Sequence, residues 1–300
     1  MQDNFKSGFV TLIGRPNVGK STLMNRLIGQ KIAITSNKPQ TTRNMIQGIY
    51  NDEDTQIVFV DTPGIHKPLN RLGTVLNQTA FHAIQDVDVV LFLVDAKTGI
   101  GKGDLFILNR LKEANAKVIL VLNKIDGMEK DDIFLAIQKA SQAYDFAEVV
   151  PISALKEKNI KELIKTITPY LSNEGKLYED DMITNISTKF YVAEIVREKI
   201  LQKTEKEVPH TVTCYVESLE EEDDLVSIQV CIVVERDNLK KIIIGKRGSM
   251  LKQIGSEARK DLEEYFSKKV YLQTYVKTID NWRDKEKYLI DLGFENHFDF

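Results

Sequence analysis

Residues 9–22 of the chain read FVTLIGRPNVGKST, an apolar run that ends at Gly14 and a helix-forming run that begins near Ser21. Glycines between a strand and a helix let backbone N–H groups converge on a phosphate, as Gly14 and Gly19 would do here. The positive N-terminal end of the following helix adds to the attraction. The stretch therefore predicts a phosphate-binding loop, in which Lys20 bridges the β- and γ-phosphates and the Ser21 hydroxyl binds Mg²⁺.

The same alternation of strand and helix continues over roughly the first half of the chain. Short runs rich in Val, Ile, Leu and Phe predict strands at residues 9–13, 45–50, 57–61, 89–95, 117–123 and 149–152. Amphipathic stretches predict helices at residues 21–27, 104–113, 131–144 and 160–171. Strands of nearly continuous hydrophobicity are covered on both faces, so this pattern predicts a doubly wound, mostly parallel α/β sheet. The polar turn at residues 51–54 predicts a hairpin that joins the second and third strands.

Three motifs that follow later strands specify the nucleotide. In Asp61-Thr-Pro-Gly64 the carboxylate can hold Mg²⁺ through water and the glycine N–H can sense the γ-phosphate. In Asn123-Lys-Ile-Asp126 the final carboxylate can accept from N1–H and from the exocyclic amine of guanine, which adenine does not present. A desolvated, unpaired carboxylate would cost several kcal/mol, so the motif predicts guanine specificity.

Other side chains complete the expected guanine site. Asn123 would reach N7, and the Lys124 stem would cover one face of the base. Backbone N–H groups of the Ser153-Ala154-Leu155 turn would meet O6. The full set of expected nucleotide-binding residues is Gly14, Asn17, Val18, Gly19, Lys20, Ser21, Thr22, Asp61, Asn123, Lys124, Asp126, Ser153, Ala154 and Leu155.

A polar loop at residues 36–44 lies between the first two motifs and would be a mobile switch. Thr41 and Thr42 are its candidates for contacting Mg²⁺ and the γ-phosphate, and we prefer Thr42. Such a threonine orders the loop only while the γ-phosphate is present. The expected metal-binding residues are therefore Ser21, Thr42 and Asp61.

These motifs together resemble the TRAFAC GTPases of the translation-factor-like, ribosome-associated branch. The resemblance implies GTP hydrolysis to GDP, with Lys20, Thr42, Gly64 and Asn17 as the catalytic set. One departure from Ras-like enzymes is Ile65, which stands where a glutamine would orient the attacking water, so slow intrinsic turnover is expected. In related GTPases with an apolar residue here, an asparagine at the place of Asn17 helps to bind K⁺; the alternative is an asparagine that only forms the turn. We interpret His66 as an exposed loop histidine rather than a replacement base.

The pattern changes after a polar linker at residues 179–185. The order becomes α-β-β-α-α-β-α, with elements at residues 190–201, 211–217, 226–234, 239–243, 249–266, 270–277 and 282–289. A Gly-Lys-Arg-Gly turn separates two of the helices, and residues 240–285 carry 12 Lys or Arg against 6 Asp or Glu. Together these features resemble a type II KH domain, which implies binding of about four unstacked nucleotides. The expected RNA-binding residues are Ile244, Gly245, Lys246, Arg247, Gly248 and Ser249; Trp282 could stack on a base or fill the core.

The resemblance covers nearly the whole chain. It implies a GTPase domain at residues 1–172, a linker at 173–185 and a smaller α+β KH domain with a C-terminal helix at 186–300. Gln40-Thr-Thr-Arg43 and the turn sequence are similar to a bacterial family in which this pair of domains binds the 3′ end of 16S rRNA and helps to mature the small ribosomal subunit. The alternative is a KH protein whose GTP domain is a sensor with negligible catalysis.

Composition sets the remaining expectations. The chain is 42% hydrophobic and 28% charged with a net charge of −3, as a globular protein would be. It has no apolar run long enough to span a membrane and no apolar signal core near its start. Cys214 and Cys231 are interpreted as buried thiols rather than a disulfide or metal site. We expect a cytoplasmic monomer that binds no DNA and contacts membranes peripherally at most.

Overall fold

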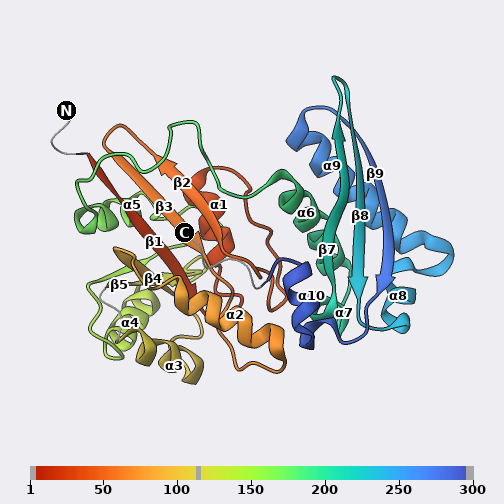
Figure 1. Cartoon of the computed structure of the whole chain (residues 1–300). Helices are drawn as coiled ribbons and strands as arrows, with labels where there is room; N and C mark the ends of the chain where they lie inside the picture. The colour runs from red at the N-terminus through yellow and green to blue at the C-terminus, as the bar shows by residue number, and fades with distance from the viewer. Residues whose placement is uncertain (1–4, 113–115, 295–300) are drawn as a thin grey trace.

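The structure, a computed structural model, describes residues 5–112 and 116–294. Glu113, the last residue of one expected helix, and the outermost residues of both expected domains lie outside the described residues. The chain forms two parts, each built on its own sheet, which stand side by side (Figure 1).

The first part contains a six-stranded sheet in the order β2-β3-β1-β4-β5-β6. Its strands are β1 (Lys6–Gly14), β2 (Ile46–Asn51), β3 (Thr55–Asp61), β4 (Val89–Asp95), β5 (Lys117–Asn123) and β6 (Glu148–Pro151). Only β2 runs antiparallel to its neighbour, through the expected hairpin with β3. All six lie where the apolar runs predicted them, and the mostly parallel sheet is confirmed.

Helices cover both faces of this sheet. They are α1 (Lys20–Ile28), α2 (Arg71–His82), α3 (Lys102–Leu111), α4 (Lys130–Ser141) and α5 (Ile160–Ile167), with the short 3₁₀ helix η1 (Thr168–Tyr170) after α5. Apolar side chains of α1 and α5 pack on one face, and those of α2, α3 and α4 pack on the other. Helix α2 was not predicted from the sequence. It begins at Asn70, whose side chain accepts a hydrogen bond from Gly73 N–H.

The second part contains a three-stranded sheet in the order β7-β8-β9, with β7 antiparallel and β9 parallel to the central strand. The strands are β7 (Thr213–Glu221), β8 (Leu225–Val234) and β9 (Lys269–Thr278). The helices are α6 (Thr188–Lys203), α7 (Val208–Thr211), α8 (Asp237–Ile244), η2 (Lys246–Gly248), α9 (Ser249–Phe266), η3 (Trp282–Asp284) and α10 (Glu286–Asp291). Helices α6, α8 and α9 bury one face of the sheet. The order of elements matches the prediction, with two differences: the short α7 was not expected, and the closing helix predicted at 282–289 is divided at Lys285 into η3 and α10.

The other face of the small sheet is shared between the two parts. Cys231 and Val233 of β8 pack with Trp282 and with Leu72 and Leu76 of α2. Trp282 is fully buried and donates its indole N–H to Thr211 O. The base-stacking interpretation of Trp282 is therefore wrong, and this side chain belongs to the core between the two parts.

The polar linker is hydrogen-bonded to the first part of the chain. Ile49 N–H donates to Ile183 O at 2.8 Å, and the Thr184 hydroxyl donates to Gln47 O at 2.6 Å. The side chain of Gln56 also bonds to the backbone of Tyr178. The linker thus extends the edge of the sheet at β2, which fixes where the second part begins.

The fold bears on two expectations from the sequence, that both cysteines are buried thiols and that no helix spans a membrane. Cys231 is buried and Cys214 half-buried, and both are free thiols. Among the helices of residues 5–112 and 116–294, none has the length and apolarity needed to cross a membrane.

Candidate nucleotide and nucleic-acid sites

The phosphate loop joins β1 to α1 and is packed too tightly for larger residues. Gly19 has φ of 101°, and a Cβ at this position would lie 2.3 Å from Nδ2 of Asn123. The loop and the Asn123 turn therefore lie in direct contact, so the phosphate and base motifs form one site. Asn17 has φ of 64°, a backbone conformation that asparagine tolerates better than most residues.

Lys20 and Asp61 form the charged centre of this site, and both are buried. The Lys20 ammonium donates to Gly14 O at 3.3 Å and to Arg15 O at 3.2 Å. Burial lowers the pKa of Lys20 to about 8, although the nearby Asp61 carboxylate opposes that shift. Burial likewise raises the pKa of Asp61, opposed by Lys20 and by hydrogen bonds from Ser21 and Thr42.

Three oxygen-bearing side chains predicted to share a metal ion meet here. Ser21 Oγ lies 2.7 Å from Thr42 Oγ1, and both hydroxyls donate to Asp61 Oδ2, at 2.6 and 3.1 Å. The second carboxylate oxygen of Asp61 is buried and has no hydrogen-bond partner among the described residues. No group of three or more His, Cys, Asp or Glu in the described part of the chain is placed to hold a metal, so an ion here would depend on the hydroxyls.

The guanine motifs lie beside the phosphate loop at the ends of β5 and β6. Asn123 Nδ2 donates to Val18 O at 2.8 Å, and its Oδ1 accepts from Ala154 N–H at 3.0 Å. Asn123 therefore links the phosphate loop to the turn that contains Ala154. One hydrogen of its amide remains for the expected contact with N7 of guanine. Lys124 extends across the site to Asn17 O at 2.6 Å.

The carboxylate expected to read guanine is held by one hydrogen bond. Ser153 Oγ donates to Asp126 Oδ1 at 2.6 Å, and this bond is the main cause of the lowered pKa of Asp126. The carboxylate is therefore ionised around neutral pH, as an acceptor for two guanine donors must be. Leu155 beside it is exposed.

The switch loop closes one side of the phosphate pocket. The pocket is lined by Pro16, Asn17, Gly19, Lys20, Ser21, Thr22, Thr35, Ser36, Gln40, Thr41, Thr42 and Gly64. Gly64 packs directly against the phosphate loop, because a Cβ added to Gly64 would lie 2.9 Å from Pro16 Cα. Ile65 is buried, and its N–H donates to Gly14 O at 3.2 Å.

His66 differs from the expectation of an exposed loop histidine. The side chain is half-buried, its Nε2 lies 2.5 Å from Nε2 of Gln40, and its backbone is bonded to Asn77 of α2. Burial lowers the pKa of His66. The reason for the difference is α2, the unpredicted helix, which covers this side of the loop.

The expected RNA-binding turn lies at the far end of the second part. It joins α8 to α9 through Gly245, with φ of 71°, and Gly248, with φ of 78°. A Cβ on Gly245 would lie 2.7 Å from Cβ of Met250, whereas nothing lies within 4 Å of one on Gly248. Lys246 and Arg247 between them are exposed.

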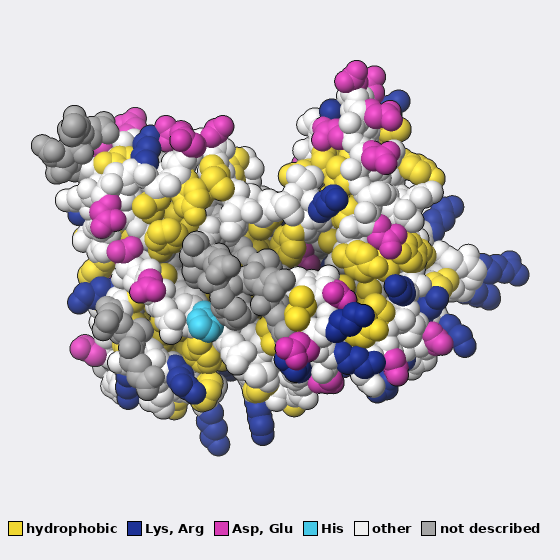
Figure 2. Space-filling view, in the orientation of Figure 1, with side chains coloured by type: hydrophobic (Ala, Val, Ile, Leu, Met, Phe, Trp, Pro, Cys, Tyr) yellow, Lys and Arg dark blue, Asp and Glu magenta, His cyan; other side chains and the backbone are white. Residues whose placement is uncertain are grey.

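Charge is distributed unevenly over the second part. Lys and Arg side chains gather over α8, α9 and the turn between them, and Asp and Glu gather at the tip of the β7–β8 hairpin (Figure 2). The exposed cations on these helices are Lys241, Lys246, Arg247, Lys252, Arg259 and Lys260. A phosphate backbone would therefore be attracted to the turn and repelled from the hairpin.

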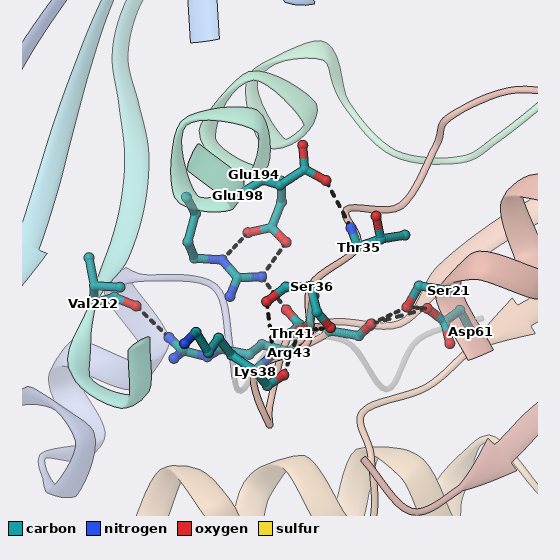
Figure 3. Close-up of polar contacts among 12 residues, drawn as sticks. Ser21, Thr35, Ser36, Lys38, Thr41, Arg43, Asp61, Glu194, Glu198 and Val212 are labelled. Atoms are coloured by element: carbon teal, nitrogen blue, oxygen red, sulfur yellow. Dashed lines mark hydrogen bonds and ion pairs between the residues drawn. The ribbon is translucent and has the colours of Figure 1, made fainter. Parts of the chain in front are cut away.

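Sequence reasoning missed a set of charged residues behind the switch loop. Arg197 and Glu198 of α6 are bonded to Thr41 and Thr35, and Glu194 of the same helix holds Arg197 (Figure 3). Helix α6 reads as an ordinary amphipathic helix, and its buried charges gave no signal in a single sequence. Arg15 was also missed; it pairs with the buried Asp104 of α3 at 2.8 Å.

Both parts of the chain match families of known proteins. Residues 9–124 match the family model described as 50S ribosome-binding GTPase, and residues 207–283 match the KH domain model. GTPase Era of Clostridium kluyveri is 47% identical over 291 residues, covering 97% of this chain and 99% of the relative.

Two solved structures resemble the whole chain, each at 40% identity over 97% of this chain and 99% of the other. A crystal structure of Era in complex with MgGDPNP and nucleotides 1506–1542 of 16S ribosomal RNA matches with a TM-score of 0.94. A tyrosine-to-alanine variant of Aquifex aeolicus Era bound to GDP·AlF₄⁻ matches with a TM-score of 0.93.

Proposed function

Because this chain belongs to the GTPase Era family, we propose that it is a GTP-hydrolysing switch that binds the 3′ region of 16S rRNA and assists maturation of the small ribosomal subunit. The observation that carries the proposal is the closure of the switch loop, in which Thr42 joins Ser21 and Asp61 beside the phosphate loop. The same loop contacts the part of the chain that bears the KH turn.

The phosphate groups of GTP would be held by the loop at residues 14–21 and by the Lys20 ammonium. Ser21, Thr42 and Asp61 fit Mg²⁺, since hard oxygen ligands converge there and one buried carboxylate oxygen has no hydrogen-bond partner within residues 5–112 and 116–294. When bound, Mg²⁺ neutralises charge on the β- and γ-phosphate oxygens. The MgGDPNP of the related structure supports this assignment.

Guanine would be selected by Asp126, with Asn123, Lys124 and the turn of Ser153, Ala154 and Leu155 around the base. Gly64 N–H and Thr42 would respond to the γ-phosphate. When the γ-phosphate leaves, both lose their partner and the loop is released. Hydrolysis thereby becomes a conformational signal.

Asn17 would assist hydrolysis by helping to bind K⁺, because Ile65 cannot orient water. Its amide nitrogen donates to Asn37 O of the switch loop at 2.9 Å, so the amide oxygen and that carbonyl would face one cation once the amide had turned over. Turnover should therefore be faster in KCl than in NaCl. Equal rates of GTP turnover in the two salts would mean that Asn17 only forms the turn.

The KH turn would hold about four unstacked nucleotides. Gly245 and Gly248 allow the RNA backbone to approach, Lys246 and Arg247 supply charge, and Ile244 and Ser249 flank the contact. We propose that the protein acts as a monomer in the cytoplasm, where its proposed rRNA partner is made. Any membrane contact would be peripheral, through the same basic side chains.

The second candidate, a sensor with negligible catalysis, is favoured by the buried, apolar Ile65. Multiple-turnover GTP hydrolysis, measured with and without an oligonucleotide of the 16S rRNA 3′ end, separates the two. The switch predicts measurable turnover that changes with the RNA. Turnover absent under both conditions, with GTP and RNA binding intact, would establish the sensor instead.

A further inference from the structure

Besides the bond from Asn44 Nδ2 to Gly293 O at 3.0 Å, three further contacts among the described residues anchor the switch loop, together with Thr35 just before it, on the second part of the chain. Thr35 N–H donates to Glu198 Oε1 at 2.9 Å, and Arg197 of α6 donates to Thr41 O. Arg43 reaches the other way and donates to Val212 O at 2.7 Å and to Pro209 O at 3.0 Å. Thr42 lies between the residues of the last two anchors, Thr41 and Arg43. None of these contacts with the second part is made by Thr42 itself.

The Arg197 anchor is held rigidly. Its guanidinium pairs with both carboxylate oxygens of Glu194, at 2.7 and 2.6 Å, and its side chain is 1% exposed. A bidentate pair fixes the orientation of the plane, so the second N–H of Nη2 is aimed at Thr41 O. Figure 3 shows Glu194 and Glu198 reaching from α6 toward the loop, with Thr41 and Arg43 below them.

The Arg43 guanidinium forms no ion pair with a carboxylate of the described residues. The side chain is 3% exposed, and its two acceptors are carbonyls of α7 and of the residue that follows it. Burial lowers the pKa of Arg43 to about 9, with the nearby Arg197 acting in the same direction, so the guanidinium is still charged at neutral pH. A buried cation held only by carbonyls is stable only while those carbonyls stay in place.

The third anchor ties the start of the loop to the same helix. Glu198 is 1% exposed, and its second oxygen accepts from the Lys31 ammonium at 2.6 Å. Lys31 also pairs with Asp261 of α9 at 3.3 Å. Thr35 and Thr41 are therefore both attached to α6, whereas Arg43 and Asn44 at the end of the loop are attached to other segments of the second part.

We propose that Glu194 and Arg197 are positioning residues for the GTP-bound state, because they hold Thr41 so that Thr42 reaches the metal position. The inference rests on the proposed switch function and deepens it. The second part is then not only the RNA-binding partner of the switch but a component of the GTP site.

Geometry explains why this coupling would be strong. Adjacent Cα atoms are 3.8 Å apart along a stiff peptide, so displacement of either anchor moves the residue between them. Mg²⁺ requires nearly ideal octahedral ligands at about 2.0–2.1 Å, and it does not follow such a displacement. GDP makes no contact that depends on Thr42 in this scheme, so its binding is insensitive to the anchors.

The test compares dissociation constants for GDPNP and GDP in the full-length protein with Mg²⁺ present. Arg197→Met removes the charge and the hydrogen bond to Thr41, and should weaken GDPNP binding by about tenfold. Glu194→Gln keeps the shape but loosens the guanidinium, and should weaken it by about threefold. GDP affinity should stay within about twofold of wild type in both.

Rescue and control variants separate positioning from general stability. Arg197→Lys can still donate to Thr41 and should recover part of the loss. Lys203→Met lies on the same helix and breaks an ion pair with Glu257 at 2.6 Å, far along the helix from the loop anchors, and should leave both affinities unchanged. If Arg197→Met does not fold, Glu194→Gln and Arg43→Met carry the same comparison.

The outcomes are distinct. A selective loss of GDPNP affinity in the anchor variants supports the proposal. Equal GDPNP-to-GDP ratios in wild type and anchor variants, whatever their melting temperatures, overturn it. If the wild-type protein bound neither GDPNP nor GDP, that result would instead contradict the proposed switch function itself.

Discussion

The hydroxyl oxygens of Ser21 and Thr42 lie 2.7 Å apart, although Ser21 stands at the start of α1 and Thr42 lies 21 residues later in the switch loop. Both also donate to the same oxygen of the buried Asp61. The contact closes the loop onto the phosphate site. It depends on a hydroxyl at position 42, which leads to the first prediction.

Replacing Thr42 with alanine should lower the GTP hydrolysis rate by about a hundredfold, because a ligand for the metal and the loop closure are lost together. GDP affinity should hardly change. Single-turnover hydrolysis and GDP binding measure the two effects. The control is Thr41→Ala, since the Thr41 hydroxyl bonds within the loop, to Lys38 O at 2.8 Å and to Ser36 O at 3.5 Å. Equal losses in both variants would contradict the choice of Thr42.

Nucleotide binding should take up protons at alkaline pH. Burial lowers the pKa of Lys20 to about 8, so above that pH the free protein carries mostly the neutral amine. Phosphate favours the ammonium, so binding must reprotonate Lys20 and affinity must fall as pH rises through about 8. Calorimetry at pH 8.5 in two buffers of different ionisation enthalpy measures the proton uptake. Lys20→Arg, charged throughout, should show none from this residue.

Replacing Asp126 with asparagine should weaken GTP binding by about a hundredfold or more. The amide would keep one acceptor oxygen but turn an N–H donor toward the second guanine donor, which leaves that donor unpaired. ATP affinity should not improve. Competition binding with GDP and ATP measures the change. Ser153→Ala removes one bond to Asp126 but keeps the carboxylate, so its loss should be smaller; the reverse order would exclude Asp126 as the guanine reader.

The fold class follows from the sequence because its signals are local. Strand β4, for example, is a continuous apolar run whose predicted and observed bounds agree at residues 89–95. The motif residues come directly after such strands, so placing the strands also places Asp61, Asn123 and Ser153 at one edge of the sheet. Local patterns therefore predicted which residues share the nucleotide site.

What the sequence did not reveal lies between the two parts of the chain. Helix α2 contains Gly73 and gives a weak helical pattern, although Asn70 is a capping residue that could have indicated its start. Arg43 and Arg197 meet only after both parts have folded, and a single sequence carries no sign of that contact. The partners of Trp282 were missed for the same reason, whereas His66 contacts Gln40 and Asn77 of its own part and was missed because α2 was not predicted.

Replacing Gly248 with aspartate should weaken binding of single-stranded RNA by at least about tenfold while the protein stays folded. Nothing lies within 4 Å of a Cβ there, so the new carboxylate points into open space beside the expected phosphates. Gly99→Asp is a matched control in the GTPase part, with similar positive φ and equal space. Fluorescence anisotropy with a short 16S 3′-end RNA measures both. Unchanged affinity in Gly248→Asp would remove the turn from the RNA site.

Replacing Trp282 with alanine should destabilise the protein by about 3–5 kcal/mol, because its indole is fully buried among residues of both parts and its N–H is bonded to Thr211 O. Trp282→Phe should cost less. Trp282 is the only tryptophan, so far-UV circular dichroism during urea unfolding is the suitable measurement. Tyr271→Ala, at an exposed aromatic of β9, should change stability by about 0.5 kcal/mol or less. A midpoint for Trp282→Ala equal to that of Tyr271→Ala would mean that the indole does not join the two parts.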